Sequence, residues 1–528
     1  MPVKFNLAED LVRTVQRTPY KVFIKTIKHP PIEKEVEITY EEFNKLVNRL
    51  GNGLKRLGVG KGDKVAAFLP YNWPEMFVFY YAVWKIGAVA VPIDHLFKAR
   101  EAEYVINHSD AIALITSKGY YNDYIASIRE KLKNVKHYIV VDGRGMDGTI
   151  DYQELLSNSS EDLEVEDVNP DDLAMIAYTS GTTGIPKGCM QTHGNIKHVV
   201  SYGVQPMSSD DRILVVVPST HSYVNCALMP AAVRIGATLY LMGRFNPIKA
   251  LEVIEKYKIT IMTGSPTVFA YLLDAYESMP RKPDVSSLQG FTTGSAPVGE
   301  KLWKRVEEVF YNARIYEYYG LTETCVTVTA DNWDGRRRHG SAGRPILGTR
   351  VKIMDLEGKK ELPPGQLGEV WVKGPQVIKG YYKDPERTKE TFIDGWVRTG
   401  DLGYMDEDGY LYIKGRIKEV IKAKGYSVDP ADIEDVVKSH PKVLDCAAVG
   451  IPHEKYGEEI VVFVVLREKG PVDEKGLEKE IIEYCKKNLA DFKVPSHVKV
   501  IDELPRTTIG KVQKFKLKEV AQKLWGQR

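Results

Sequence analysis

A segment rich in glycine and hydroxyl side chains, Tyr178 to Gly188, has the residue types that bind a polyphosphate. It reads YTSGTTGIPKG and follows a short apolar run. Small residues let backbone N–H groups approach an anion, hydroxyl groups add donors and can reach a metal ion, and the lysine supplies positive charge. A flexible surface loop can have the same composition. The segment is not a Walker A loop, because GxxxxGK[ST] occurs nowhere in the chain.

The order of residues in this segment resembles the phosphate-loop signature YTSGTTGxPKG of the adenylate-forming enzymes. That superfamily comprises acyl-CoA synthetases, peptide-synthetase adenylation domains and beetle luciferases, and the chain resembles its acyl-CoA synthetase branch. The resemblance extends from about Thr39 to Lys514. It implies that Thr179 is catalytic and also reaches a metal ion. The implied phosphate-binding residues are Thr179, Ser180, Gly181, Thr182, Thr183, Gly184 and Lys187.

Further segments resemble the family's motifs for adenine and magnesium, in the family's order. Tyr318 to Glu323 resembles YGxTE, which implies an aromatic ring on adenine, Thr322 at the α-phosphate, and Glu323 as a catalytic residue that helps to hold Mg²⁺. A π face, a hydroxyl donor and a hard oxygen ligand suit these tasks. Alone, the segment could be any strand end and turn. With the preceding Gly-Ala-Pro-like strand end, the implied adenine-side residues are Gly294, Ser295, Ala296, Pro297, Tyr318, Tyr319, Gly320 and Thr322.

Asp401 closes a segment that resembles the motif WxxTGD. The resemblance implies that its carboxylate accepts hydrogen bonds from both ribose hydroxyls, which its two oxygens allow. Ile413 and Arg416 belong to the next family pattern, which places Arg416 near the ribose and the phosphate. A Gly-Asp β-turn is the ordinary alternative for Asp401.

Lys511 ends a segment, Leu504 to Lys511, that resembles LPxTxxGK. The resemblance makes Lys511 the candidate catalytic lysine and a nucleotide-binding residue. A long flexible cation can bridge the attacking carboxylate and the α-phosphate as charge spreads in the transition state. A lone lysine in a basic tail would be a solvated surface residue, but the ordered motifs before it favour the catalytic interpretation.

The segment Pro218 to Asn225 resembles the family's P-x-x-H motif at the acyl pocket. His221 would position the carboxylate and is counted among the catalytic residues, without a proton-transfer role; a satisfied core histidine is the alternative. The acyl pocket implied by the resemblance is His221, Tyr223, Asn225, Gly294 and Gly320. Because Ser222 to Met229 contains no acidic residue that could bind an amine, we expect a fatty or aryl monocarboxylate rather than an amino acid.

Lys418 occupies the family's hinge position, two residues after Arg416. The segment beyond it is expected to turn toward the active site for reaction with coenzyme A, with Lys422, Lys424 and Gly425 as the residues involved. Lys-Gly-Tyr-Ser stands there in place of the usual Gly-Glu-Asn, a variant also found in plant-type aryl-CoA ligases and luciferases.

Composition is that of an ordinary globular protein, with 43% hydrophobic and 27% charged residues in a chain of 528. A net charge of +2 gives no general attraction for nucleic acid or an anionic membrane. The most apolar stretch, Met76 to Ile93, is interrupted by Lys85, Gly87 and Pro92, which argues against a membrane span. Five scattered cysteines without a CxxC pair, and no secretory signal at the start, favour the cytoplasm.

Short apolar runs alternate with amphipathic segments and predict an α/β fold with largely parallel sheets. Predicted strands include 64–68, 112–115 and 138–141, and predicted helices include 40–57, 122–132 and 247–257. We expect an N-terminal adenylation domain over residues 1–416, built of packed α/β subdomains and a β-rich subdomain at about 340–416. A small, mobile α+β domain would follow over residues 417–528.

The reaction implied by the resemblance has two steps. A carboxylate attacks the α-phosphate of Mg²⁺-bound ATP to give acyl-AMP and pyrophosphate, and coenzyme A then releases AMP and acyl-CoA. Loading of a separate carrier protein, a luciferase-like oxygenase and an inactive nucleotide-binding module are the alternatives. Intact Thr179, Lys187, Glu323, Asp401, Arg416 and Lys511 argue against the last. The sequence leaves a homodimer open.

Overall fold

The computed structural model describes residues 4–179, 186–204, 207–330, 338–423, 426–453, 457–468, 470, 473–507 and 510–526. The chain forms two compact units. The N-terminal unit comprises Met1–Val351 and Val372–Val397, and the C-terminal unit comprises Lys352–Trp371 and Arg398–Arg528. The predicted α/β class is confirmed, whereas the domain boundary that we place at residue 416 remains a prediction.

One sheet of the N-terminal unit has seven strands in the order β7-β6-β5-β3-β4-β8-β9. Neighbours pair in parallel from β7 to β8, and only the β8–β9 pair is antiparallel. Strands with helices on both faces are expected to be buried along their length, as β4 and β5 are; β4 is apolar throughout, and β5 is apolar up to Thr116 and Ser117 at its end. The strands are β3 (Lys64–Phe68), β4 (Val89–Pro92), β5 (Ala113–Ser117), β6 (His137–Val141), β7 (Ile150–Asp151), β8 (Leu173–Thr179) and β9 (Lys187–Thr192).

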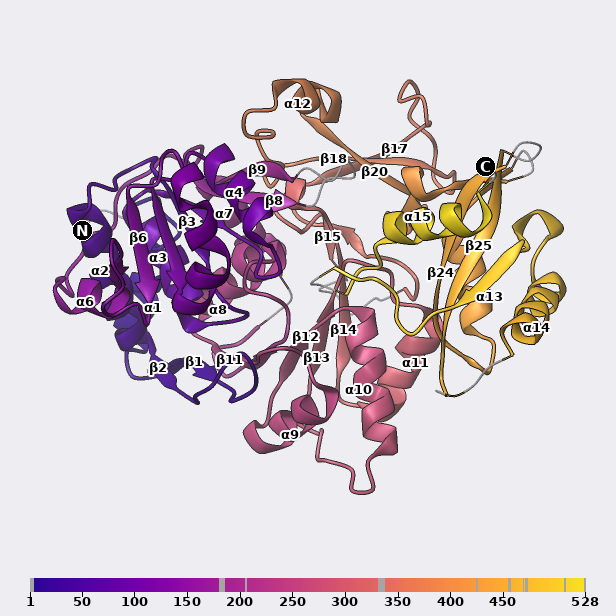
Figure 1. Cartoon of the computed structure of the whole chain (residues 1–528), viewed down its shortest axis with the longest axis horizontal. Helices are drawn as coiled ribbons and strands as arrows, with labels where there is room; N and C mark the ends of the chain where they lie inside the picture. Colours follow the sequence, from indigo (N-terminus) through magenta and orange to yellow (C-terminus); the bar gives the residue numbers. More distant parts are fainter. Residues whose placement is uncertain are drawn as a thin grey trace. The chain divides into compact units, whose positions relative to one another are not determined.

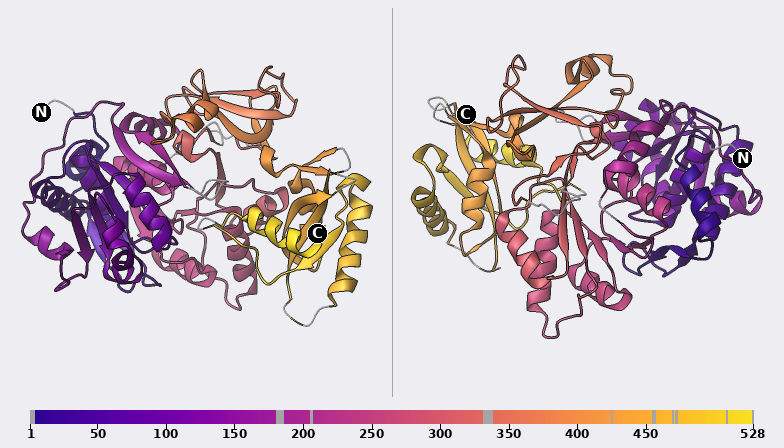
Figure 2. Two further views of the ribbon diagram at one scale, coloured as in Figure 1. Left: turned by 45° about the horizontal axis from the view of Figure 1, so that its top comes forward. Right: turned by 180° about the vertical axis from the view of Figure 1, so that it is seen from behind.

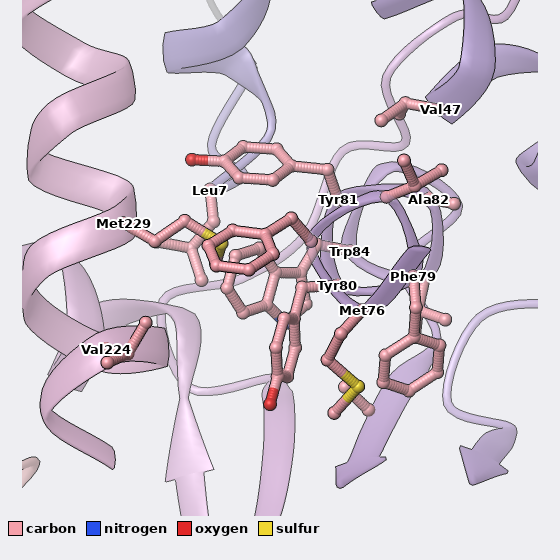
Figure 3. Packing of buried hydrophobic residues seen from close by; sticks show 14 of the residues in the cluster. Leu7, Val47, Met76, Phe79, Tyr80, Tyr81, Ala82, Trp84, Val224 and Met229 are labelled. Atoms are coloured by element: carbon pink, nitrogen blue, oxygen red, sulfur yellow. The ribbon is translucent and has the colours of Figure 1, made fainter. Parts of the chain in front are cut away.

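Helix α3 (Pro74–Lys85) is buried on every side, as its apolar sequence requires. Figure 3 shows Tyr81 and Trp84 of this helix close to Leu7 and Met229, which come from distant parts of the N-terminal unit. Lys85 is only 2% exposed, and its ammonium group donates to Asn44 Oδ1 over 3.0 Å and to Asn48 Oδ1 over 2.5 Å. The apolar stretch is therefore a core helix followed by a buried strand.

The second sheet of this unit has nine strands in the order β16-β15-β14-β13-β12-β10-β11-β1-β2. The strands from β14 to β1 pair in parallel, and the outer pairs are antiparallel. Figure 1 shows α9 (Pro247–Tyr257), α10 (Pro266–Ser278) and α11 (Glu300–Val309) beside β12, β13 and β14. The strands are β1 (Val22–Thr26), β2 (Glu37–Thr39), β10 (Arg212–Val215), β11 (Thr238–Leu241), β12 (Ile261–Thr263), β13 (Gly290–Thr293), β14 (Arg314–Tyr319), β15 (Thr329–Ala330) and β16 (Arg344–Pro345).

A five-stranded sheet follows, and most of it belongs to the C-terminal unit. Its strand β20 (Trp396–Met405) pairs antiparallel with β21 (Leu411–Arg416), and the register sets Asp401 opposite Arg416. The other strands are β17 (Arg350–Met354), β18 (Gly368–Lys373) and β19 (Phe392–Ile393).

The last sheet is covered by helices on both faces, as both views in Figure 2 show for the gold segments. Alternate residues of β24 (Val443–His453) face opposite layers: Cys446 and Ala448 pack with α13 (Pro430–Lys438) and α14 (Glu474–Asn488), and Ala447 packs with α15 (Lys514–Trp525). The other strands are β22 (Ile421–Ala423), β23 (Tyr426–Val428), β25 (Gly457–Leu466) and β26 (His497–Val500).

The remaining helices connect or cover these sheets. These helices are α1 (Glu9–Arg17), α2 (Tyr40–Arg56), α4 (Ala99–His108), α5 (Lys118–Tyr120), α6 (Tyr152–Ser157), α7 (His193–Tyr202), α8 (Met229–Ile235) and α12 (Pro385–Thr391). In the described parts of the chain, no helix has the length and apolar character needed to cross a membrane.

Candidate active site

The two ends of the phosphate-binding segment meet at the end of a hairpin. Strand β8 ends at Thr179, strand β9 begins at Lys187, and the antiparallel register sets these two residues opposite each other. A hydroxyl group and an ammonium group are therefore carried at the mouth of the same loop. The predicted ligands Ser180, Gly181, Thr182, Thr183 and Gly184 lie outside the described residues.

Three parallel strands bring the other predicted residues of this unit to one edge of the nine-stranded sheet. Because β10, β13 and β14 are parallel, the segments after their carboxyl ends start at the same edge. The segment after β10 carries His221, the segment after β13 begins with Gly294, and Gly320 follows β14. In an open α/β sheet this edge is where ligands bind.

Gly294 and Gly320 are both needed for close packing of the backbone at this edge. A Cβ atom on Gly294 would lie 3.0 Å from the carbonyl oxygen of Tyr318, and one on Gly320 would lie 2.1 Å from that of Val326. Ser295 adopts a φ of +67°, a left-handed conformation that is uncommon for residues other than glycine. The predicted adenine-side segments thus approach each other as closely as their backbones allow.

His221 and Tyr223 follow β10 and are hydrogen-bonded to each other and to the sheet. The Tyr223 amide donates to His221 Nδ1 over 3.2 Å, so a neutral ring carries its proton on Nε2. Burial lowers the pKa of His221 to about 4, which keeps the ring neutral near pH 7. The Tyr223 hydroxyl donates to Thr292 Oγ1 over 2.7 Å, and its ring centroid lies 6.3 Å from that of Tyr318.

Asn225, which we predicted to line the acyl pocket, is fully buried and hydrogen-bonded within the protein. Its amide nitrogen donates to Tyr80 Oη and to the Thr220 carbonyl, each over 3.1 Å. Asn225 therefore anchors the segment after β10 to helix α3.

Glu323, the predicted magnesium ligand, is held by a residue that sequence reasoning missed. The Tyr381 hydroxyl donates to Glu323 Oε1 over 2.7 Å, and the Ile378 amide donates to the Glu323 carbonyl over 3.0 Å. The Lys187 ammonium lies 4.9 Å from the centroid of the Tyr381 ring. The only sequence signal was an aromatic pair after Gly380, which carries no chemistry by itself.

The donor set at Glu323 fits a magnesium ion that arrives with ATP. Magnesium keeps most of its waters and is usually bound through one or two carboxylates together with substrate phosphates. Glu323 is partly exposed, as is Thr179. Among the described residues there is no group of three or more histidine, cysteine or acidic side chains that could hold a metal on its own.

The predicted ribose-side residues come together within the C-terminal unit. Arg416 Nε lies 2.7 Å from Asp401 Oδ1, and Asp401 is 4% exposed. Burial and the nearby Arg416 lower the pKa of Lys511, whereas Glu419 and Asp401 act in the opposite direction. Lys511 is held in a turn in which the Thr507 amide donates to the Lys511 carbonyl over 2.7 Å.

The remaining predicted residues of this unit lie on its strands and connections. Ile413 in β21 pairs with Gly403 of β20. Lys418 is exposed in a short 3₁₀ turn, Ile417–Glu419, and Lys422 is exposed in β22. Lys424 and Gly425 lie outside the described residues.

A cavity of about 830 Å³ lies in the N-terminal unit, away from the residues above. It is lined by Pro70 and Trp73 after β3, by the end of β5 and the residues that follow it (Ser117 to Tyr120), and by charged residues of both signs, Lys28, Glu33, Asp123 and Asp142. β3 has β4 on one side and β5 on the other, so the side on which successive strands are added to the sheet changes between β3 and β5. Such a reversal leaves a crevice at the carboxyl ends of the strands.

Family models and known relatives match nearly the whole chain. The model of the AMP-binding enzymes matches residues 11–382, and that of the AMP-binding enzyme C-terminal domain matches residues 432–511. An oxalate–CoA ligase from Arabidopsis thaliana is 34% identical over 492 residues, which are 92% of this chain and 93% of the relative. A long-chain-fatty-acid–CoA ligase from Bacillus subtilis (strain 168) is 30% identical over 511 residues, which are 92% of this chain and 90% of the relative.

A solved structure has the same fold along its whole length. ATP-bound MatB from Rhodopseudomonas palustris superposes with a TM-score of 0.88 at 31% identity, covering 99% of each chain. The resemblance that we inferred from the motifs is confirmed. The chain belongs to the AMP-binding enzymes and is one of their ATP-binding, AMP-forming acid–CoA ligases.

Proposed function

We propose that this acid–CoA ligase activates a fatty or aryl monocarboxylic acid, with Thr179, Lys187 and Glu323 at the phosphates of ATP. The observation that carries the proposal is the contact of Lys187 and Glu323 with the same tyrosine side chain. This contact holds a phosphate-binding cation beside a metal-binding carboxylate. In-line displacement at a phosphate requires both kinds of group in fixed positions.

In the first step a carboxylate oxygen of the substrate forms a bond to the α-phosphorus, and the bond from that phosphorus to the pyrophosphate oxygen breaks. Lys187 and Thr179 bind the phosphate oxygens, and Glu323 would hold a magnesium ion that neutralises the developing charge. Lys511 supplies a further cation for the transition state. Asp401 holds the ribose hydroxyls, and its contact with Arg416, the other residue predicted near the ribose, supports this role.

His221 is proposed to hold the substrate carboxylate as a hydrogen-bond donor. Because Nδ1 already accepts a bond from the Tyr223 amide, Nε2–H is the group left to donate. The low pKa of about 4 argues against a general base that must gain a proton at neutral pH.

The choice of acid rests on the segment after His221. Val224, Ala227 and Leu228 are buried and apolar, and Tyr223 presents an aromatic ring. We propose that the acyl group binds beside this apolar segment, which suits an alkyl chain or an aromatic ring, and Ser222 to Met229 offers no carboxylate for an amino group. Relatives that act on oxalate and on long-chain fatty acids are similarly close, so overall identity does not select the acid.

In the second step the thiol sulfur of coenzyme A forms a bond to the acyl carbon, and AMP leaves. Lys418 would act as the pivot about which the segment containing Lys422, Lys424 and Gly425 turns toward the active site.

The test is to measure AMP formation from ATP with a panel of fatty, aryl, dicarboxylic and amino acids, each with and without coenzyme A. We expect AMP release to require a monocarboxylic acid. We expect more than one AMP to be released per enzyme molecule only when coenzyme A is present. Turnover with oxalate or an amino acid in preference would refute the substrate proposal. Stoichiometric acyl-AMP that coenzyme A does not discharge would instead favour transfer to a carrier protein.

A further inference from the structure

Tyr381 contacts two groups that lie far apart in sequence. Its hydroxyl donates to Glu323 Oε1 over 2.7 Å, and its ring lies 4.9 Å from the Lys187 ammonium. Glu323 follows strand β14, whereas Lys187 begins strand β9. These strands belong to different sheets of the N-terminal unit. One side chain thus contacts a residue of one sheet and a residue of the turn that follows a strand of the other.

The backbone around Tyr381 is held firmly enough to position a side chain. The Met190 amide donates to the Gly380 carbonyl over 3.1 Å, and the Tyr382 amide donates to the Gly188 carbonyl over 2.8 Å, so Tyr381 forms an isolated antiparallel bridge with Cys189 of β9. Thr388 Oγ1 accepts the Tyr381 amide over 3.0 Å. The Tyr381 side chain is 3% exposed and packs edge-on against Phe392.

The Tyr381 hydroxyl is a neutral donor, so its hydrogen bond orients the Glu323 carboxylate without neutralising the charge, whereas a lysine or arginine would neutralise it. The bond engages Oε1, and the carboxylate keeps further lone pairs with which it can bind a cation.

We propose that Tyr381 is a positioning residue for the adenylation step and acts through two separable contacts. The hydroxyl orients the Glu323 carboxylate toward the magnesium ion, and the ring supports the Lys187 ammonium beside the phosphates. The inference rests on the proposed function, because it takes Glu323 and Lys187 as the groups that bind Mg²⁺ and phosphate.

The two contacts can be removed one at a time. Tyr381→Phe keeps the ring and loses the hydroxyl, so the Mg²⁺ concentration that gives half-maximal pyrophosphate release should rise roughly tenfold, the effect of one hydrogen bond to a charged group. At saturating Mg²⁺ the KM for ATP should stay within about twofold of wild type. Tyr381→Leu also removes the ring and should raise that KM roughly threefold or more, the effect of a partly buried cation–π contact.

Tyr382→Phe is a matched control, because the neighbouring tyrosine makes the same kind of bond elsewhere. The Tyr382 hydroxyl donates to Asp110 Oδ2 over 2.9 Å, away from Glu323. Its removal should leave the Mg²⁺ dependence unchanged. An equal change in both phenylalanine variants, or none in Tyr381→Phe, would overturn the proposal.

A double-mutant cycle and a binding measurement separate this inference from the proposed function. On a Glu323→Gln background, Tyr381→Phe should have no further effect on Mg²⁺ dependence, and an additive effect would show that the hydroxyl does not act through Glu323. Calorimetric binding of a non-hydrolysable ATP analogue at several Mg²⁺ concentrations reports the same shift without turnover. If wild type binds the Mg²⁺-nucleotide and Tyr381→Phe shifts that binding, the inference stands even where no acid is activated.

Discussion

The two units of the molecule each hold a carboxylate that we propose to be functional, and they hold it in different ways. In the N-terminal unit Glu323 accepts a hydrogen bond from the neutral phenol of Tyr381, whereas in the C-terminal unit Asp401 pairs with the guanidinium of Arg416. A neutral donor fixes the geometry of a carboxylate and leaves its charge for a cation. A guanidinium partner compensates the negative charge, which suits a carboxylate that has only to accept hydrogen bonds from hydroxyls.

The largest expected effect is at Lys511, which belongs with the charged residues Asp401 and Arg416 of the C-terminal unit. Lys511→Ala should slow formation of acyl-AMP by about 100-fold or more, because one transition-state electrostatic contact is lost. Conversion of supplied acyl-AMP and coenzyme A to product should barely change. Both half-reactions are measured on the same preparation. If the variant adenylates normally, Lys511 is not part of the site. An equal defect in both steps would point to general misfolding.

Asp401→Ala sharpens the comparison by leaving Arg416 without its partner. The KM for ATP should rise about tenfold or more, since hydrogen bonds to a charged group contribute roughly 1.5–3 kcal/mol, while the KM for the acid stays nearly constant. Steady-state kinetics with each substrate varied in turn gives both constants. Our ribose assignment is wrong if only the acid constant moves.

Replacing Lys418 tests whether the C-terminal unit must rearrange between the two steps. Lys418→Pro fixes φ in the short turn Ile417–Glu419, and hinge residues have to absorb large changes in φ and ψ. Thioester formation should fall several-fold, to roughly the extent that rotation limits the rate, while acid-dependent pyrophosphate release survives. Lys418→Ala is the control, because it keeps a free φ. Loss of both steps alike would count against a pivot.

The smallest expected effect is at His221, which we propose to be a neutral hydrogen-bond donor in the N-terminal unit. Burial lowers the pKa of His221 to about 4 from 6.5, so the ring stays neutral in the folded protein as pH falls to about 5, while the unfolded chain gains a proton. This histidine therefore lowers stability as pH falls from 6.5 toward 4 and contributes nothing above 6.5. The KM for the acid should vary less than about twofold between pH 6 and 8, because no charge changes there. An inflection near 6.5 that disappears in His221→Gln would contradict this assignment.

Local patterns in the sequence predicted the regular elements well, because each depends on residues close together in the chain. The strand predicted at 64–68 and the helix at 247–257 have the predicted bounds. The helix predicted at 122–132 is instead a π-helical turn, Tyr121–Ile125, followed by a 3₁₀ segment, Ala126–Lys131. Its buried residues Tyr121, Ile125 and Ile128 still follow helical spacing, so apolar period alone does not distinguish these helix types.

Lys187, Glu323 and Asp401 could be proposed from the sequence because each lies in a motif that resembles the family's, and their roles stay predictions. Tyr381 could not be found in this way, since its role comes from a contact with Glu323 that spans 58 positions of the chain. The same holds for the turn after Glu323, where Cys325 and Val326 have φ values of +45° and +71°. A β-branched residue in the left-handed region is held there by its surroundings, and no local pattern announces it.

The opposed register of Thr179 and Lys187 ties the spacing of a hydroxyl group and an ammonium group to the pairing of β8 with β9. A shift of β9 by one residue relative to β8 would turn the Lys187 side chain to the other face of the hairpin. Strand pairing therefore sets the place of this cation, and an insertion that shifts the register should displace it even where every residue type of the segment is kept.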